Sequence, residues 1–230
     1  NASPIGVKEY LKLLIDDIEI SKSSLYLENS VVTSIAFGGG TPTYMDDKDT
    51  TKLMSYIYSN FKCKNELEVS FEASPETITQ DRNYLLSVLM SLGVNRLSIG
   101  IQSFNDSQLK LLNRRHDSKM AENAVVEARK AGFSNINLDL MYGLPGQSLL
   151  NWEQTLFKTT EVNPQSISLY RLRIHPEGKL ANVKKQDFLD EYLFSLMYMM
   201  AVVHFTNNGY LQISSHVFVQ SVDHIQKHVT

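Results

Sequence analysis

The sequence has 230 residues, of which 43% are hydrophobic and 20% are charged, and its formal net charge at pH 7 is −3. This composition is typical of a globular protein, and the charge balance does not indicate a general nucleic-acid binder. No apolar stretch approaches the roughly 20 residues that a membrane span needs. The single cysteine, Cys63, excludes an internal disulfide and any cysteine-only metal site. We therefore expect a cytoplasmic protein without a membrane span.

Apolar, β-rich runs alternate with amphipathic stretches of helical spacing along the chain. The expected helices are residues 7–20, 48–61, 81–92, 106–112, 120–131, 150–162 and 188–207. The expected strands are residues 31–37, 67–71, 96–101, 136–141 and 167–172, with a short sixth strand at 211–214. This alternation predicts βαβ units and a parallel sheet. Right-handed crossovers allow either an open doubly wound sheet or a barrel, and periodicity alone does not choose between them.

The domain organisation follows from the absence of a low-complexity linker. Residues 1–2 are interpreted as the remnant of an expression tag, and residues 3–220 are expected to form one domain. The polar stretch 176–185 is the expected loop or break.

Polar residues stand at or near the ends of three predicted strands. Glu72 follows the second strand, Gln102 follows the third, and Asp139 lies inside the fourth. Any one of these residues could be a helix cap or an ordinary loop residue. That explanation accounts less well for polar residues at matching positions of all three strands. Because the carboxyl ends of parallel strands share one edge, these side chains are expected to converge. Asp139 is the strongest case, since a carboxylate in an apolar run is costly without a partner.

Three consecutive glycines, Gly38 to Gly40, follow the first predicted strand and precede Thr41 and Pro42; we name these three residues the glycine turn. Because glycine has no Cβ atom, a ligand can approach the backbone of this turn closely, and the backbone N–H groups can bind a carboxylate. The turn lacks the Gly-x-Gly-x-x-Gly spacing of a dinucleotide site and the Lys-Ser/Thr of a phosphate loop. These absences argue against a nucleoside triphosphate.

Four segments of the sequence resemble motifs of the oxygen-independent coproporphyrinogen III oxidase and haem-chaperone branch of the radical SAM proteins. They are residues 37–43, 95–105, 112–116 and 139–147, with a weaker fifth match at 166–170. Together they cover roughly residues 30–180 in the order of the family. The resemblance implies an α/β fold, a partial (β/α)6 barrel with S-adenosylmethionine at the carboxyl ends of its strands.

The resemblance also implies a set of S-adenosylmethionine contacts. The glycine turn would contact the methionine amino and carboxylate groups, and carboxylates suit the ribose hydroxyls. Arg114 would suit a carboxylate, which a guanidinium binds in a bidentate pair, and Arg173 would act largely through its backbone. No catalytic residue and no metal ligand is assigned. The implied contacts are Gly39, Gly40, Thr41, Glu72, Gln102, Arg114, Asp139 and Arg173.

The chemistry of the family needs a [4Fe–4S] cluster, held by the thiolates of a Cys-x-x-x-Cys-x-x-Cys loop. This sequence has no such loop, and Cys63 is interpreted as a lone surface or structural thiol. In the family the loop precedes the helix that matches residues 7–20. The first strand of the barrel and its cluster loop are therefore expected upstream of Pro4, and the chain alone is expected to be inactive.

Two functional classes stay open. As an enzyme, the parent protein would be a radical SAM oxidoreductase that acts on a tetrapyrrole by a 5′-deoxyadenosyl radical, with a reductant protein such as flavodoxin or ferredoxin. As a binding protein, it would be a haem chaperone or haem-utilisation protein.

The sequence gives mixed signals between these two classes. The Arg-x-His pattern at 114–116 is more similar to the chaperone and haem-utilisation branches, whereas residues 212–218 depart from the chaperone pattern. A single histidine is more often structural than a ligand. The candidate haem ligands are His204, His216, His224 and His228.

Overall fold

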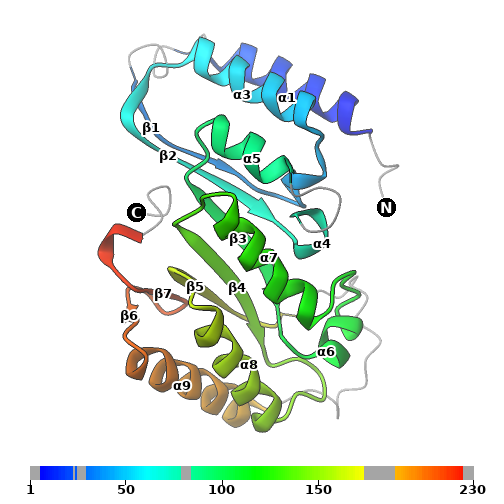
Figure 1. Ribbon diagram of the computed structural model, residues 1–230, viewed down its shortest axis with the longest axis vertical. Coiled ribbons are helices and arrows are strands. Elements are labelled where there is room, and N and C mark those ends of the chain that lie inside the picture. Colours follow the sequence, from blue (N-terminus) through cyan, green and yellow to red (C-terminus); the bar gives the residue numbers. More distant parts are fainter. Residues whose placement is uncertain (1–5, 23, 25–29, 79–83, 174–189, 225–230) are drawn as a thin grey trace.

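The structure is a computed structural model that describes residues 6–22, 24, 30–78, 84–173 and 190–224. These residues fold around one curved sheet (Figure 1). Its strand order is β1-β2-β3-β4-β5-β7-β6. The first five strands pair in parallel, each with its neighbour in sequence. They are β1 (Val32–Phe37), β2 (Cys63–Ala73), β3 (Arg96–Gln102), β4 (Ile136–Tyr142) and β5 (Ser166–Arg171).

The sequential strand order decides the question that periodicity left open. A doubly wound sheet reverses its order at a switch point, whereas here each right-handed crossover continues in the same direction and leaves its helix on the same face. Figure 1 shows α5, α7 and α8 over one face of the sheet. The winding is therefore that of a barrel. The α-helices are α1 (Val7–Lys22), α3 (Asp47–Asn60), α4 (Pro75–Ile78), α5 (Tyr84–Ser91), α6 (Asp106–Leu111), α7 (Ser118–Lys130), α8 (Leu149–Val162) and α9 (Glu191–Asn207).

Side-chain alternation along the strands separates an apolar face from a polar one. In β3, Leu97, Ile99 and Ile101 are completely buried in the core beneath the helices. Ser98, which lies between them, and Gln102, which follows Ile101, project from the opposite, concave face, because successive strand residues point to opposite sides. The concave face of the sheet is therefore polar.

Short polar side chains fix where the helices begin. Five helices start at a residue whose side-chain oxygen accepts a hydrogen bond from a backbone N–H of the first turn, which satisfies one otherwise unpaired donor. In α8 the cap is a reciprocal capping box with Asn151. The capping residues are Asp46, Asn105, Asp117, Ser148 and Asp190.

The last two strands differ from the expected sixth parallel strand. Residues 211–214 supply only β6 (Leu211–Gln212), while β7 (Val217–Val219) pairs antiparallel with β5 and lies between β5 and β6. The more apolar segment takes the inner position, because Phe218 is fully buried there whereas Leu211 is half exposed.

Some residues for which the sequence makes a prediction are not described by the structure. Residues 1–2, 81–83, 176–185, 188–189 and His228 lie outside the described residues. None of the helices in the described ranges is long and apolar enough to cross a membrane.

Candidate functional site

The glycine turn and Glu72 lie against each other at the carboxyl edge of the sheet. Phe37 pairs with Phe71, so the residues that follow them, Gly38 and Glu72, meet side by side. The backbone N–H of Gly39 donates to Oε2 of Glu72 at 3.3 Å. The Glu72 carboxylate is exposed, so it can also accept hydrogen bonds from a ligand.

The backbone of the turn itself leaves open space for a ligand. Gly39 and Gly40 have φ angles of +79° and +77°, which L side chains rarely adopt. A Cβ atom at either position would meet nothing within 4 Å. Thr41 follows as the cap of the short helix η1 (Pro42–Tyr44), which begins at a proline. The turn therefore ends on a rigid element.

Asp139 lies on the concave face, next to Glu72. Its Oδ1 accepts a hydrogen bond from Asn137 Nδ2 at 2.8 Å, and Ser98 donates to Oδ2 at 3.4 Å. Ser98 is also the register partner of Glu72, so one serine lies between the two carboxylates. Burial raises the pKa of Asp139 to about 6; the nearby Glu72 charge adds to the rise, and the hydrogen bond from Asn137 opposes it.

Gln102 ends β3 in a strained turn. Its φ is +65°, and the N–H of Ser103 donates to the carbonyl of Ile101 at 2.8 Å, which closes a γ-turn around Gln102. The side chain is buried and folds back along the strand, since a Cβ atom on Gly100 would lie 3.0 Å from Gln102 Nε2. Gly100 therefore makes room for the amide group of Gln102.

The two predicted arginines differ in their exposure and in their distance along the chain from a strand. Arg114 is half-buried in the loop between α6 and α7, and its guanidinium makes no hydrogen bond or ion pair with the described residues. Arg173 is exposed two residues after β5, and among the same residues its side chain has no such partner either. The structure thus brings Glu72, Asp139 and the glycine turn together and does not join Arg173 to them.

Sequence reasoning missed a polar network deeper in the concave face. Arg96 is 2% exposed; its Nη2 donates to Ser166 at 3.2 Å, while its Nε and Nη1 have no hydrogen-bond partner among the described residues. Ser166 and Ser168 both donate to Oδ1 of Asn137, at 2.9 and 3.1 Å. The missed signal was the alternation of polar residues within β3, β4 and β5, which marks their second face.

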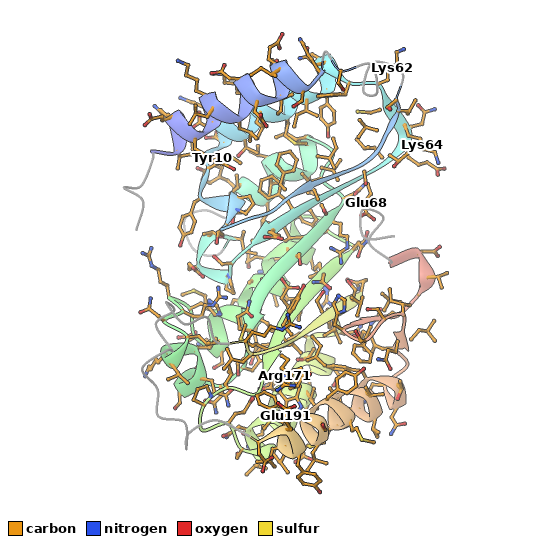
Figure 2. The ribbon with its side chains drawn as sticks, turned by 180° about the vertical axis from the view of Figure 1, so that it is seen from behind. Tyr10, Lys62, Lys64, Glu68, Arg171 and Glu191 are labelled. Atoms are coloured by element: carbon orange, nitrogen blue, oxygen red, sulfur yellow. The ribbon has the colours of Figure 1, made fainter. Side chains whose placement is uncertain are left out.

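Burial lowers the pKa of Arg96, and the negative charges of Glu68 and Asp139 act in the opposite direction. Glu68 is itself buried on β2 (Figure 2). The base of the concave face is therefore a charged network built into the fold.

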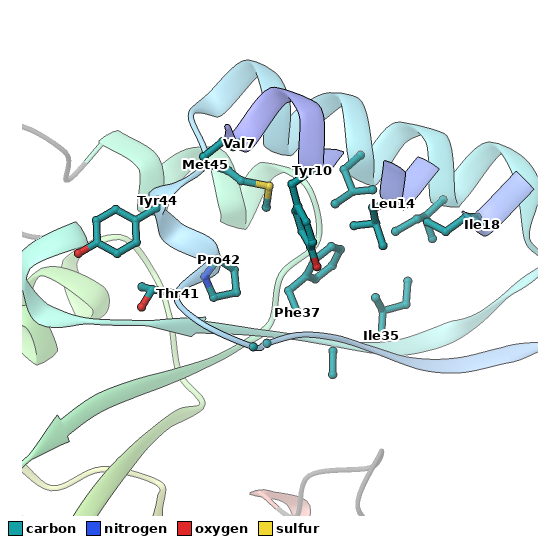
Figure 3. Close-up of a pocket in the computed structure, with 15 residues that line it drawn as sticks. Val7, Tyr10, Leu14, Ile18, Ile35, Phe37, Thr41, Pro42, Tyr44 and Met45 are labelled. Atoms are coloured by element: carbon teal, nitrogen blue, oxygen red, sulfur yellow. The ribbon is translucent and has the colours of Figure 1, made fainter. Parts of the chain in front are cut away.

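A cavity of about 410 Å³ lies beside this site, between α1 and β1 (Figure 3). Tyr10 and Leu14 of α1 lie opposite Ile35 and Phe37 of β1, so its walls are largely apolar. The cavity reaches the glycine turn, but Glu72, Gln102 and Asp139 do not line it. It therefore shares the glycine turn with the polar site but is separate from the two carboxylates.

The residues of this sequence do not fit an iron–sulfur cluster. Cys63 is the only cysteine, and it begins β2, whereas the glycine turn and Glu72 lie at the far end of that strand, about 30 Å away along an extended chain. Among the described residues, no group of three or more His, Cys, Asp or Glu side chains could hold a metal ion. By contrast, the glycine turn and the two carboxylates suit the polar groups of S-adenosylmethionine.

The candidate haem ligands have different surroundings. His204 of α9 is packed edge-on against Phe157 and lies 3.1 Å from the hydroxyl of Thr160, which identifies it as a structural residue. His216 is exposed just before β7, and its ring centroid is 6.2 Å from that of Tyr170.

Comparisons with known proteins identify the family of this chain. The sequence profile of the Radical SAM superfamily matches residues 13–158. A haem chaperone (HemW) of Buchnera aphidicola subsp. Acyrthosiphon pisum is 35% identical over 193 residues, which are 84% of this chain and 50% of that protein. An oxygen-independent coproporphyrinogen III oxidase of Salmonella typhimurium is 34% identical over 179 residues, 78% of this chain and 38% of that enzyme.

The solved structure of coproporphyrinogen III oxidase (HemN) from Escherichia coli superposes with a TM-score of 0.82 at 28% identity, over 94% of this chain and 50% of that one. This chain spans about half the length of the relatives it matches. The chain belongs to the radical SAM superfamily, in the group that contains the oxygen-independent coproporphyrinogen III oxidases and the haem chaperones.

Proposed function

We propose that this chain is the S-adenosylmethionine-binding part of a longer radical SAM oxidoreductase that acts on a tetrapyrrole. The observation that carries the proposal is the meeting of the glycine turn, Glu72 and Asp139 at one edge of the sheet. Such an edge is where parallel α/β folds build their sites. Relatives named as coproporphyrinogen oxidases and as haem chaperones support the tetrapyrrole class.

In this proposal each part of the site has a physical task. The backbone of the glycine turn contacts the methionine amino and carboxylate groups, and Glu72 and Asp139 accept hydrogen bonds from ribose hydroxyls. Gln102 supplies amide contacts, and Arg114 pairs with a carboxylate. When bound, S-adenosylmethionine supplies the chemistry for hydrogen abstraction, and the chain's own residues orient it.

The cluster and its electrons are not supplied by this chain. With one cysteine, the chain alone does not assemble a [4Fe–4S] cluster and is inactive, and a reductant protein such as flavodoxin or ferredoxin serves the parent protein. Anaerobic reconstitution with iron and sulfide tests this proposal. About four irons per chain would contradict it.

Binding of S-adenosylmethionine to the chain, measured by equilibrium dialysis, tests the site directly. Glu72→Ala and Asp139→Asn are expected to weaken binding about tenfold each, which corresponds to a lost hydrogen bond to a charged group. Glu66→Gln is the matched control, since Glu66 is exposed on the same strand and six residues before Glu72. Equal binding by wild type and both site variants would refute the assignment.

The second candidate is a haem-binding protein of the same family. One observation favours it: the exposed His216 imidazole beside Tyr170 is available to a planar, iron-containing ligand. Titration with haem separates the two candidates. A Soret shift that His216→Ala abolishes and His204→Ala preserves would support haem binding, and the absence of a shift would leave the oxidoreductase.

A further inference from the structure

A buried histidine lies directly behind the proposed S-adenosylmethionine site. His116 is 4% exposed, yet it contacts two polar atoms from different parts of the fold. Its Nδ1 lies 3.1 Å from Oε2 of Glu76 on α4, and its Nε2 lies 3.1 Å from the carbonyl oxygen of Ile101 on β3. One imidazole thus connects α4, the helix that follows β2, with the end of β3.

The chemistry of the two neighbours defines the form of the ring. An ionised carboxylate and a backbone carbonyl are both acceptors only, so the ring makes both hydrogen bonds only when each nitrogen carries a proton. The imidazolium then has Glu76 as its counter-ion, which a buried charge requires. When the ring carries both protons, the contact of His116 with Glu76 is an ion pair as well as a hydrogen bond.

Glu76 extends the connection to the glycine turn. The hydroxyl of Tyr44 donates to Oε1 of Glu76 at 3.4 Å, and Tyr44 belongs to η1, the short helix that directly follows Thr41. Burial alone would raise the pKa of Glu76, but hydrogen bonds from His116, the backbone and Ser74 outweigh it and lower the pKa to about 2. Glu76 is therefore held as a carboxylate between two site loops.

Ile101 extends the connection to Gln102. The same carbonyl that accepts from His116 also accepts from Ser103 N–H at 2.8 Å and closes the γ-turn around Gln102. A turn with positive φ at a non-glycine residue costs free energy and persists only when its surroundings hold it. His116 is one of the groups that hold it.

The histidine also fixes the loop that carries Arg114, two residues earlier in the chain. That loop is anchored at its start, where Arg114 N–H donates to the carbonyl of Leu109 at 2.9 Å. At its other end, the His116 side chain inserts into the core, whereas Arg115 and Asp117 on either side of it are exposed. The position of Arg114 is therefore set between two anchors.

We propose that His116, paired with Glu76, is the positioning residue that aligns the glycine turn, Gln102 and Arg114 for S-adenosylmethionine. This inference rests on the proposed function of the site and adds a residue that does not itself touch the ligand. The ion pair joins three separate loops, each of which carries an expected contact.

The alternative is that His116 only fills space in the core, and the two roles predict different responses. A packing role tolerates an apolar residue of similar volume. A positioning role requires the hydrogen bonds, because without them the Ile101 carbonyl and the Glu76 carboxylate lose their shared donor.

The experiment measures S-adenosylmethionine affinity by equilibrium dialysis for the chain and four variants, together with their thermal unfolding. His116→Phe keeps a ring and removes both donors, and His204→Phe is the matched control at a structural histidine of α9. Glu76→Gln retains a hydrogen-bonding amide that pairs with a neutral His116, whereas Glu76→Leu retains only volume.

We expect His116→Phe and Glu76→Leu to weaken binding about tenfold, and Glu76→Gln and His204→Phe to stay within about threefold of wild type. Folded His116→Phe with wild-type affinity would overturn the proposal, as would Glu76→Leu binding as well as Glu76→Gln.

Amide hydrogen exchange at Ser103 provides a readout that needs no ligand. His116→Phe is expected to speed exchange of this N–H at least tenfold relative to His204→Phe, because the γ-turn loses its second anchor. Failure of wild type to bind S-adenosylmethionine would refute the function proposed above, and exchange at Ser103 would still decide the role of His116. Unchanged exchange would refute that role.

Discussion

The carboxylate of Glu72 occupies the space that a side chain on Gly38 would need. A Cβ atom at Gly38 would lie 2.7 Å from Oε1 of Glu72 and 2.9 Å from its Cδ. The absence of that Cβ atom lets the carboxylate reach the N–H of Gly39. The first glycine of the turn therefore serves Glu72, while the second and third leave open space for the ligand.

Gly38→Ala should thus impair binding more than folding. The added methyl group displaces only the end of a flexible, exposed side chain, so the free energy of unfolding should change by less than about 1 kcal/mol. S-adenosylmethionine affinity should fall severalfold, because Glu72 leaves its position. Equilibrium dialysis and urea unfolding measure the two effects. Gly6→Ala, where a Cβ atom would meet nothing within 4 Å, is the control.

Asp139→Asn should stabilise the protein at neutral pH while it weakens the site. The folded-state pKa of Asp139 is raised to about 6 from an ordinary value of 3.8, so the folded state binds more protons than the unfolded state between these values. Stability should fall by up to about 3 kcal/mol as the pH rises through this interval, and then stay lower.

The amide that Asp139→Asn introduces retains an oxygen for the hydrogen bond from Asn137 and carries no charge. Unfolding curves of wild type and Asp139→Asn from pH 4 to pH 7.5 measure the difference. A constant difference between the two proteins across this range would contradict the burial of an ionised Asp139.

Two glycines of the loop after β4 form a matched pair of tests. Gly143 and Gly146 have φ angles of +79° and +69°, so alanine strains the backbone at both. Only at Gly143 does a neighbour also block the Cβ atom, which would lie 1.9 Å from the ring of Phe194. Gly143→Ala should therefore cost about 2 kcal/mol more than Gly146→Ala, in line with the penalties of overpacking. Adding Phe194→Leu should recover part of that difference in thermal unfolding.

Trp152 should be a main determinant of how α9 attaches to α8. The indole is completely buried, and its Nε1 donates to the carbonyl of Met197 at 2.7 Å. Trp152→Phe removes this donor and leaves a small cavity, with an expected cost of about 2–3 kcal/mol. Urea unfolding measures the cost. Leu150→Ala, at an exposed position of the same helix, should change stability by less than about 1 kcal/mol.

The parallel part of the fold could be predicted because local signals agreed with it. Buried strands such as β3 are apolar on one face, and amphipathic helices begin at residues such as Asp117 and Ser148, whose side chains cap them. The polar residues Glu72 and Asp139 were recognisable because they interrupt or end apolar runs.

The remaining features depend on contacts between distant segments. Nothing local indicates that His116 would meet Glu76, 40 residues earlier, or that Arg96 would meet Ser166, 70 residues later. The sequence predicted one short strand at 211–214 and missed β7, the more deeply buried segment, which pairs with β5. Arg173 is exposed and without a hydrogen-bond partner among the described residues, so its role stays a prediction.

The reversed direction of β7 has a consequence for how such a protein can diversify. Because β7 runs opposite to β5, its first residues lie at the edge where the parallel strands end, and His216 thereby comes to lie beside Tyr170. A hairpin tip can change in length and sequence without disturbing the register of the five parallel strands. Residues at this rim can therefore vary while the five parallel strands, with the glycine turn and Glu72 at their carboxyl edge, keep their arrangement.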